Sequence, residues 1–333
     1  MKLSFLSGKK NTVNLLINDY SIQFLELKSS SPLVASRFGE YLLPPGIVET
    51  GRIADTEKFE IILEERIQEW GLKRKSVRFL VPDSVVVIKR ISIPADIKED
   101  EIKGYLYLEF GTNIHLPFEN PVFDYTVLNS TGGQRELLLY AAPEDLVSSY
   151  AALFEKLKLP AVSADISPLS QRRLHDHFHK LEEQKSTLMV QFQLNAFTMT
   201  IFEGIYPILT RHIPIDFLFE DWETTQSLIS EGYYRFKPSH ENELENSYVF
   251  QDAVKEMEKV MNFFRFSLHQ GNREIDAVFI CGDHPFLGGI EDIMNSRLDI
   301  PVLHIGHSEI LTAQGEKLPE KFYSVLGLAL KEV

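Results

Sequence analysis

The sequence predicts a two-lobed α/β protein, and three observations carry this prediction. The chain has 333 residues, about twice the usual length of one domain. Segments with strand character alternate with segments of helical periodicity, as in α/β folds. A strand–turn–strand pattern at 13–28 returns at 188–202, which indicates a repeated unit.

Composition and charge exclude several classes of protein. Hydrophobic residues make up 44% of the chain and charged residues 25%, as in globular proteins. The 34 basic and 48 acidic residues leave a net charge of -14, which repels nucleic acids and anionic lipids. A single cysteine, Cys281, excludes an intrachain disulfide and fits a reducing compartment. We find neither a signal peptide nor an apolar stretch of about 20 residues, so a cytoplasmic location is expected.

The first half of the chain predicts a hairpin followed by alternating elements. Strands are expected at 13–18 and 21–28, and Asp55 is a suitable N-cap for a helix that ends at Gly71. Further strands are expected at 77–81, 85–93, 125–129, 136–141 and 162–166, and helices at 98–110, after Pro143, and from the last strand towards Glu183.

The second half predicts a similar lobe. We expect strands at 188–192, 197–202, 277–281 and 302–304, and helices at 251–270, 288–297 and from Pro319. The stretch 214–248 has no clear pattern, and the charged stretch 180–186 is the expected linker between lobes. The first lobe is assigned to 1–81, 144–185 and 313–333, an inserted module to 82–143, and the second lobe to 186–312.

Several short segments, in order along the whole chain, form a recognisable series. They are Leu43-Pro44-Pro45-Gly46-Ile47-Val48, Gly51-Arg52-Ile53-Ala54-Asp55, Ile93-Pro94 with Glu99-Asp100-Glu101 and Leu116-Pro117-Phe118, Tyr140-Ala141-Ala142-Pro143, Phe263-Phe264 with Ile275-Asp276-Ala277-Val278, and Gly327-Leu328-Ala329-Leu330. Together they resemble the PilM family of type IV pilus assembly proteins. The resemblance implies an actin-like (ribonuclease-H-like) α/β fold of two lobes, with an inserted strand–helix–strand module in the first lobe.

The resemblance also implies partners and a location. Such proteins bind the short cytoplasmic N-terminal peptide of a single-span (bitopic) inner-membrane protein of the PilN type. The peptide is expected in a groove between the first lobe and the module at 82–143, where an extended segment can pair with a sheet edge. Other components of the platform, including a motor ATPase, are further expected partners. The chain would then lie on the cytoplasmic face of the inner membrane, held there by its partner.

An actin-like fold binds ATP between its lobes, and the resemblance assigns five residues to that cleft. Asp19 aligns with the family's acidic residue of the first hairpin turn, and Ser21 could donate to a phosphate. Glu256, Lys259 and Gly282 occupy the positions assigned to the adenosine side.

Each nucleotide motif also departs from the family pattern. Tyr20 stands where a small residue belongs, and Gln191 and Gln193 stand at the usual Asp and Gly of the second turn. Asp283 adds negative charge beside Gly282, where paired glycines are expected. We therefore predict a pseudo-ATPase scaffold without a cofactor and without a metal. The alternatives are an ATP-binding switch in the same assembly and a divergent enzyme of the sugar-kinase class.

Three other features have ordinary structural interpretations. His175 and His179 share a helix face at i, i+4 spacing and could hold a metal, but a solvated polar face is the favoured interpretation. Asp165 is expected to cap a helix or accept hydrogen bonds. Cys281 lies in an apolar run and is expected to be buried.

Overall fold

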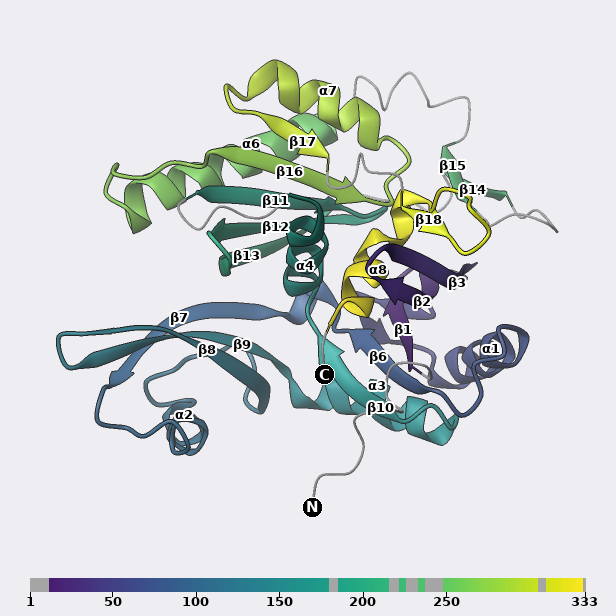
Figure 1. Cartoon of the computed structure of the whole chain (residues 1–333), viewed down its shortest axis with the longest axis horizontal. Coiled ribbons are helices and arrows are strands. Elements are labelled where there is room, and N and C mark those ends of the chain that lie inside the picture. Colours follow the sequence, from purple (N-terminus) through teal and green to yellow (C-terminus); the bar gives the residue numbers. More distant parts are fainter. Residues whose placement is uncertain are drawn as a thin grey trace.

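The computed structural model describes residues 12–179, 185–215, 222–225, 233–236, 248–304 and 310–331. Figure 1 shows two lobes, with the second lobe above the first and a three-stranded module extending to one side. The expected linker falls mainly on 180–184, outside the described residues, and β11 begins at Ser186.

The first lobe is built on a six-stranded sheet in the order β10, β6, β1, β2, β3, β18. The bounds are β1 Thr12–Ile17, β2 Ser21–Ser30, β3 Leu33–Leu42, β6 Ser76–Leu80, β10 Ala161–Asp165 and β18 Leu311–Thr312. β1 pairs antiparallel with β2 and parallel with β6. The pairing of β18 with β3 returns the chain to this sheet two residues before the boundary assigned at 313.

Two helices cover one face of this sheet. The helices are α1, Thr56–Glu69, and α3, Glu144–Lys156. The side chain of Asp55 accepts from the amide of Lys58, 3.0 Å away, which confirms the predicted N-cap. Phe59 and Phe154 are fully buried in this core, so the apolar stripes of both helices lie against the strands. A short hairpin, β4 Val48–Glu49 and β5 Arg52–Ile53, precedes α1.

The inserted module is a three-stranded antiparallel sheet in the order β7, β9, β8, with one helix against it. Its elements are η1 Asp83–Val85, β7 Val87–Pro94, α2 Ile102–Glu109, β8 Pro121–Thr131 and β9 Gln134–Pro143. The helix is shorter than the predicted range 98–110 and buries Ile102 and Leu106. The predicted turn through Gly132 and Gly133 joins β8 and β9, and both glycines have positive φ.

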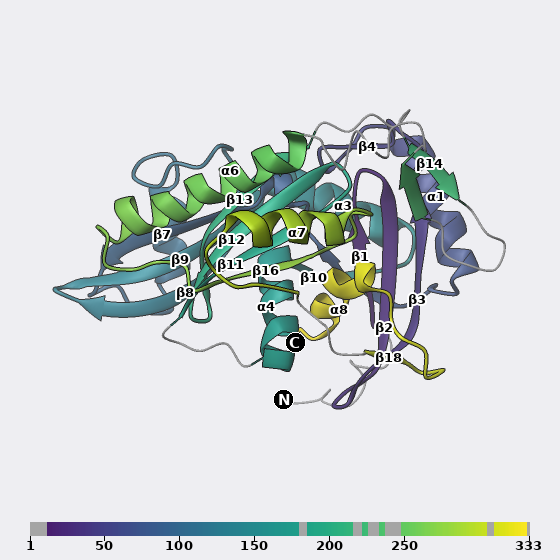
Figure 2. The ribbon, with the colours of Figure 1, turned by 90° about the horizontal axis from the view of Figure 1, so that it is seen from above.

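The second lobe is built on a five-stranded sheet in the order β13, β12, β11, β16, β17. The bounds are β11 Ser186–Phe192, β12 Ala196–Glu203, β13 Tyr206–Pro214, β16 Ala277–Gly282 and β17 Val302–His304. Figure 2 shows α6, Tyr248–Asn262, and α7, Leu287–Arg297, lying over this sheet. α6 continues as a π-helical segment, η3, Phe263–Leu268. Within 214–248, β14 Trp222–Thr225 pairs with β15 Tyr233–Phe236.

Two helices pack between the lobes. They are α4, Ser167–His179, and α8, Tyr323–Ala329, preceded by η4, Glu320–Phe322. An added Cβ on Gly327 would lie 2.2 Å from the carbonyl oxygen of Ser170, so these helices touch at their backbones. Phe322, Val325 and Leu326 are fully buried, so the apolar face of the C-terminal helix belongs to the core. No helix among the described residues is long and apolar enough to cross a membrane.

Candidate functional site

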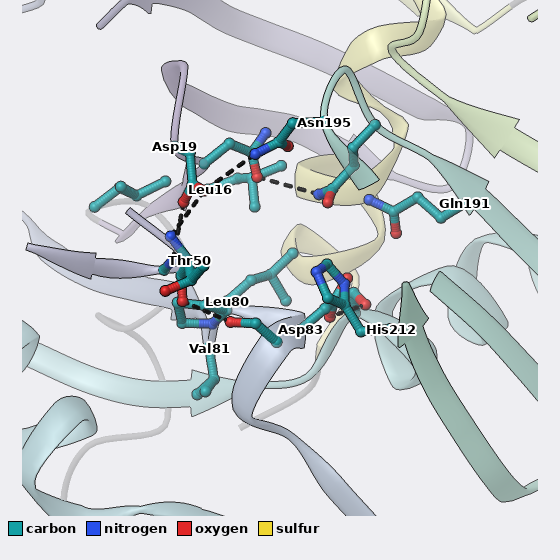
Figure 3. Close-up of a pocket in the computed structure, with 16 residues that line it drawn as sticks. Leu16, Asp19, Thr50, Leu80, Val81, Asp83, Gln191, Asn195 and His212 are labelled. Carbon is teal, nitrogen blue, oxygen red and sulfur yellow. Dashed lines mark hydrogen bonds between the residues drawn. The ribbon is translucent and has the colours of Figure 1, made fainter. Parts of the chain in front are cut away.

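The two hairpin turns of the lobes meet in a polar cleft, shown in Figure 3. The space between them is about 480 Å³, open solvent included. The polar side chains that line it are Asn18, Asp19, Thr50, Asp83, Ser84, Ser167, Gln191, Gln193, Asn195 and His212. This is the place that the resemblance assigns to the phosphates, because it lies between the β1–β2 turn and the β11–β12 turn.

Asp19 lies in the cleft as predicted, but its carboxylate is surrounded by donors of the protein itself. It accepts from the backbone amides of Thr50, at 2.9 Å, and Gly51, at 2.8 Å. The side-chain amide of Asn195, from the second lobe, donates to the same carboxylate at 3.0 Å. These three hydrogen bonds link Asp19 to the β4–β5 turn and to the opposite lobe.

Ser21, in contrast, does not point into the cleft. Its side chain is fully buried and is absent from the cleft lining. Its hydroxyl has no hydrogen-bond partner among the described residues, and its carbonyl accepts from the amide of Asn18 at 2.8 Å. The expectation that Ser21 donates to a phosphate is therefore wrong, because the strand register directs its side chain into the protein interior.

The glutamines of the second turn make contacts inside the protein. Gln193 donates from Nε2 to Oδ1 of Asn18 at 3.2 Å, which joins the two turns directly. Gln191 accepts from the side-chain amide of Gln171 on α4.

Gly282, at the end of β16, lies against the backbone of β11. An added Cβ on Gly282 would lie 1.8 Å from the carbonyl oxygen of Phe192. This glycine therefore permits close approach of β16 to β11, whatever its relation to adenosine.

Tyr20 crosses from the first lobe to the second. Its hydroxyl donates to the carboxylate of Asp283, 2.8 Å from either oxygen, and accepts from the amide of Leu194 at 3.3 Å. Burial and the nearby Glu40 carboxylate raise the pKa of Asp283 to about 7. Burial, with the Asp283 charge, also raises the pKa of Tyr20. The bulky residue at the first turn thus occupies the space between the turns and binds the second lobe.

A partly buried cluster around Asp83 was not predicted from the sequence. Asp83 accepts from the hydroxyls of Ser167 and of Thr198, the latter at 3.2 Å. Because the one hydroxyl proton of Thr198 goes to Asp83, Nδ1 of His212 is the donor in the 3.0 Å contact with Thr198. Burial raises the pKa of Asp83 and lowers that of His212. The available signal was that Asp83 follows strand β6 at the same sheet edge as Asp19 follows β1.

Glu256 and Lys259 lie on α6, outside the cleft lining. Lys259 pairs with Glu256 at 2.6 Å, one helical turn away. Arg211 of β13 approaches the same carboxylate at 3.9 Å. The adenosine-side pair is thus engaged with neighbouring charges on the surface of the second lobe.

The remaining sequence expectations are mostly structural. Asp165 accepts from the amide of Ile166 at 2.9 Å and pairs with Arg173, so it is a hydrogen-bonding residue at the end of β10. Cys281 is buried, and burial raises the pKa of its thiol to about 12. The expectation that His175 lies on a solvated helix face is wrong, because its side chain is buried. Its ring packs edge-on against Phe279, with the ring centroids 4.1 Å apart. Within the described part of the chain, His, Cys, Asp and Glu form no group that could hold a metal.

A second concave surface lies where the module joins the first lobe. It is a groove of about 930 Å³, open solvent included, lined by Arg52, Phe118, Glu119, Asn120, Pro143, Glu144, Asp145 and Ser148. An adjoining hollow of about 750 Å³ in the module is lined by Phe110, Gly111, Ile114, His115, Leu116, Pro117, Phe118 and Glu119. Phe118 and Glu119 belong to both linings, so the two form one continuous surface, here called the junction groove.

The junction groove has an acidic end and an apolar end. At the acidic end, Arg52 donates to Asp145 at 3.1 Å, and this hydrogen bond lowers the pKa of Asp145. Glu119 and Glu144 are exposed beside them. The apolar end is formed by the ring and aliphatic side chains of the loop after α2. An extended peptide with apolar residues and a cationic group would complement this surface.

Comparisons with known proteins agree with this architecture. The family model "Type IV pilus assembly protein PilM" matches residues 15–214. The solved "PilM-PilN type IV pilus biogenesis complex" contains a chain of the same actin-like fold, with a TM-score of 0.75 at 16% identity over 97% of this chain and 98% of that one.

More distant solved structures give lower scores. The ethanolamine utilization protein EutJ from Carboxydothermus hydrogenoformans has a TM-score of 0.49 at 10% identity, over 96% of this chain and 88% of that one. MreB5 of Spiroplasma citri bound to AMPPNP has a TM-score of 0.45 at 9% identity, over 95% and 94%. Because the family model covers more than half of the chain, this protein belongs to the PilM family of type IV pilus assembly proteins.

Proposed function

We propose that the protein is a non-catalytic scaffold of type IV pilus assembly, which binds the cytoplasmic N-terminal peptide of a PilN-like bitopic membrane protein in the junction groove. Family membership supports the role in pilus assembly. The chain of similar fold comes from a complex of PilM with PilN, which supports the choice of partner. The partner would hold this protein at the cytoplasmic face of the inner membrane, beside the other platform components and their motor ATPase.

The observation that carries the proposal is the position and chemistry of the junction groove. One wall comes from β5 and the start of α3 in the first lobe, and the other from the loop after α2 in the module. The exposed carboxylates of Glu119 and Glu144 attract a basic side chain. Arg52 gives one of its five N–H donors to Asp145, and its half-exposed guanidinium can bind a peptide carbonyl with another.

The absence of ATP hydrolysis is proposed from the contents of the cleft. Nucleotide phosphates in an actin-like cleft need small side chains and free amide donors at both turns. Here Tyr20 spans the turns, and the side chains of Asn18 and Gln193 are bonded to each other. The carboxylate of Asp19 is already bound by three donors. The residues present therefore do not fit MgATP, and we assign neither a cofactor nor a catalytic residue to this cleft.

The test is a binding titration with a labelled peptide that has the N-terminal cytoplasmic sequence of the cognate PilN-type protein. Glu119→Lys reverses a charge in the exposed loop that lines both parts of the groove. We expect it to weaken binding at least tenfold, or about 1.4 kcal/mol. Glu258→Lys makes the same charge change on the exposed face of α6 in the second lobe and should leave the affinity unchanged. Equal affinities of wild type and Glu119→Lys would refute the assigned groove.

A further inference from the structure

The β4–β5 turn lies between the cleft and the junction groove and touches both. Thr50 and Gly51 are the two central residues of this turn, since Glu49 pairs with Arg52. Both Thr50 and Gly51 line the cleft, while the next residue, Arg52, lines the junction groove. A change in the backbone of this two-residue turn would therefore alter both the cleft and the junction groove.

The backbone of the turn is strained. Thr50 has φ 49° and Gly51 has φ 77°. Positive φ at both central residues is what a type I′ hairpin turn requires, but for a β-branched residue such as Thr it is a genuine outlier. Strain of this kind persists only where the surroundings hold the backbone in place.

Three neighbouring residues, two from the segment at 82–84 and one from α3, hold the turn. The hydroxyl of Ser84 donates to the Thr50 carbonyl at 2.7 Å, and the hydroxyl of Tyr150 on α3 donates to the Gly51 carbonyl at 3.0 Å. Gly51 lies so close to Pro82 that an added Cβ would be 2.3 Å from its Cβ. These contacts all come from the first lobe and its junction with the module.

Asp19 adds a contact that depends on the second lobe. Its two carboxylate oxygens accept from the amides of Thr50 and Gly51, and the oxygen that binds Thr50 also accepts from Asn195. Figure 3 shows Asn195 reaching Asp19 across the cleft, with Thr50 on the other side of the carboxylate. The second lobe thus holds the Asp19 carboxylate through Asn195, and this carboxylate in turn holds the amides of Thr50 and Gly51.

We propose that Asp19 and Asn195 couple the relative position of the two lobes to the junction groove, by holding the Thr50–Gly51 turn and hence the Arg52 guanidinium in its binding position. This inference rests on the proposed function, because it concerns the same groove. Asp19, which the resemblance assigns to nucleotide binding, would act here as a positioning residue. When Asn195 moves away, the carboxylate is held by the turn alone, Thr50 can relax, and Arg52 loses its fixed place beside Asp145.

The variants separate the effect of the Asn195–Asp19 contact on the groove from the effect of losing any other contact with the second lobe. Asn195→Ala removes the bond from the second lobe, and Asn195→Asp replaces it by charge repulsion at nearly unchanged volume. Arg52→Ala removes the groove side chain whose position the turn is proposed to control. The double variant Asn195→Ala/Arg52→Ala combines both changes. Arg90→Ala is the control, since it breaks another contact of the second lobe, the 2.9 Å ion pair of β7 with Glu203, that does not involve Asp19.

The readouts are the affinity for the labelled PilN-type peptide and amide hydrogen exchange of residues 47–53. We expect both Asn195 variants to weaken binding three- to tenfold and to speed exchange in 47–53, while Arg90→Ala changes neither. In the Arg52→Ala background, Asn195→Ala should have no further effect on affinity, because its influence passes through Arg52. Additive losses in the double variant would overturn the coupling.

Failure of the coupling and failure of the proposed function give different results. If Arg52→Ala and Glu119→Lys weaken binding while both Asn195 variants bind like wild type, the coupling is wrong and the groove stands. If all of these variants bind like wild type, the groove itself is wrong. Thermal unfolding of each variant shows that the protein is folded at the temperature of the titration.

Discussion

At the scale of single residues, Tyr20 makes the most direct link between the lobes. Its hydroxyl bonds both to the carboxylate of Asp283 and to the amide of Leu194. Tyr20→Phe leaves these buried groups without that partner, which costs about 1–3 kcal/mol. We expect the free energy of unfolding in urea to fall by that amount. The control, Tyr125→Phe, removes an exposed hydroxyl that donates to the Glu99 carbonyl at 3.3 Å. It should change the free energy of unfolding by less than about 0.5 kcal/mol.

Asp283 gives stability a defined dependence on pH. Its folded pKa is about 7, raised by burial and Glu40, against about 3.9 in the unfolded chain. Between these values the folded state binds more protons than the unfolded state, so the contribution of this group to stability falls as pH rises from about 4 to about 7. Asp283→Asn removes this dependence and keeps an acceptor for Tyr20.

The measurement is urea unfolding of wild type and Asp283→Asn across this pH range. The stability of the variant relative to wild type should increase with pH up to about 7 and then stay level. The exposed substitution Asp292→Asn on α7 should follow the wild-type curve. A difference between wild type and Asp283→Asn that is constant with pH would show that this carboxyl has no raised pKa.

Single residues also show what sequence reasoning can and cannot find. Asp19 lies in the cleft, where the resemblance assigns it, in the turn that follows β1. Its partner Asn195 lies 176 residues away, and no local pattern encodes a contact at that separation. Asp83 was missed for the same reason, since its partners Ser167 and Thr198 come from α4 and β12.

At the scale of elements, the β4–β5 turn depends on Gly51. Alanine at positive φ costs roughly 1–2 kcal/mol, and at Gly51 the added Cβ would also meet Pro82 at 2.3 Å. Gly71→Ala is the matched control, because its φ is also positive but the nearest atom is a flexible arginine nitrogen at 3.8 Å. We expect Gly51→Ala to lower the melting temperature clearly more than Gly71→Ala. Equal decreases in the melting temperature of the two variants would mean that the contact with Pro82 does not destabilise Gly51→Ala.

Elements with a local signal were predicted well, and elements without one were not. The N-cap at Asp55 and the glycine turn at 132–133 locate α1 and the β8–β9 hairpin from a few residues. The third strand of each lobe, β3 and β13, was missed because mixed polar and apolar residues there give no strict alternation. The end of α6 was predicted as regular helix, but its change to π-helical bonding has no composition signal.

At the scale of the whole molecule, the resemblance gave the fold and the family, which the structure and the comparisons confirm. The resemblance implied a partner groove between the first lobe and the module at 82–143, without naming the residues that line it. The junction groove that we propose for this role is formed by two segments, the loop at 118–120 and the start of α3 at 143–148, together with Arg52. Such a surface exists only after the module has packed on the first lobe, so no single segment of the sequence can display it.

We propose that this chain works through the junction groove, and that the side chains of its cleft leave no site that fits MgATP. The most direct test is to titrate the labelled PilN-type peptide into the wild-type protein with and without saturating MgATP, and to record the melting temperature under both conditions. We predict the same peptide affinity and the same melting temperature in both. A ligand of the folded state at a hundredfold excess over its dissociation constant stabilises by about 2.7 kcal/mol. A clear rise of the melting temperature with MgATP, or a change in peptide affinity, would contradict the claim.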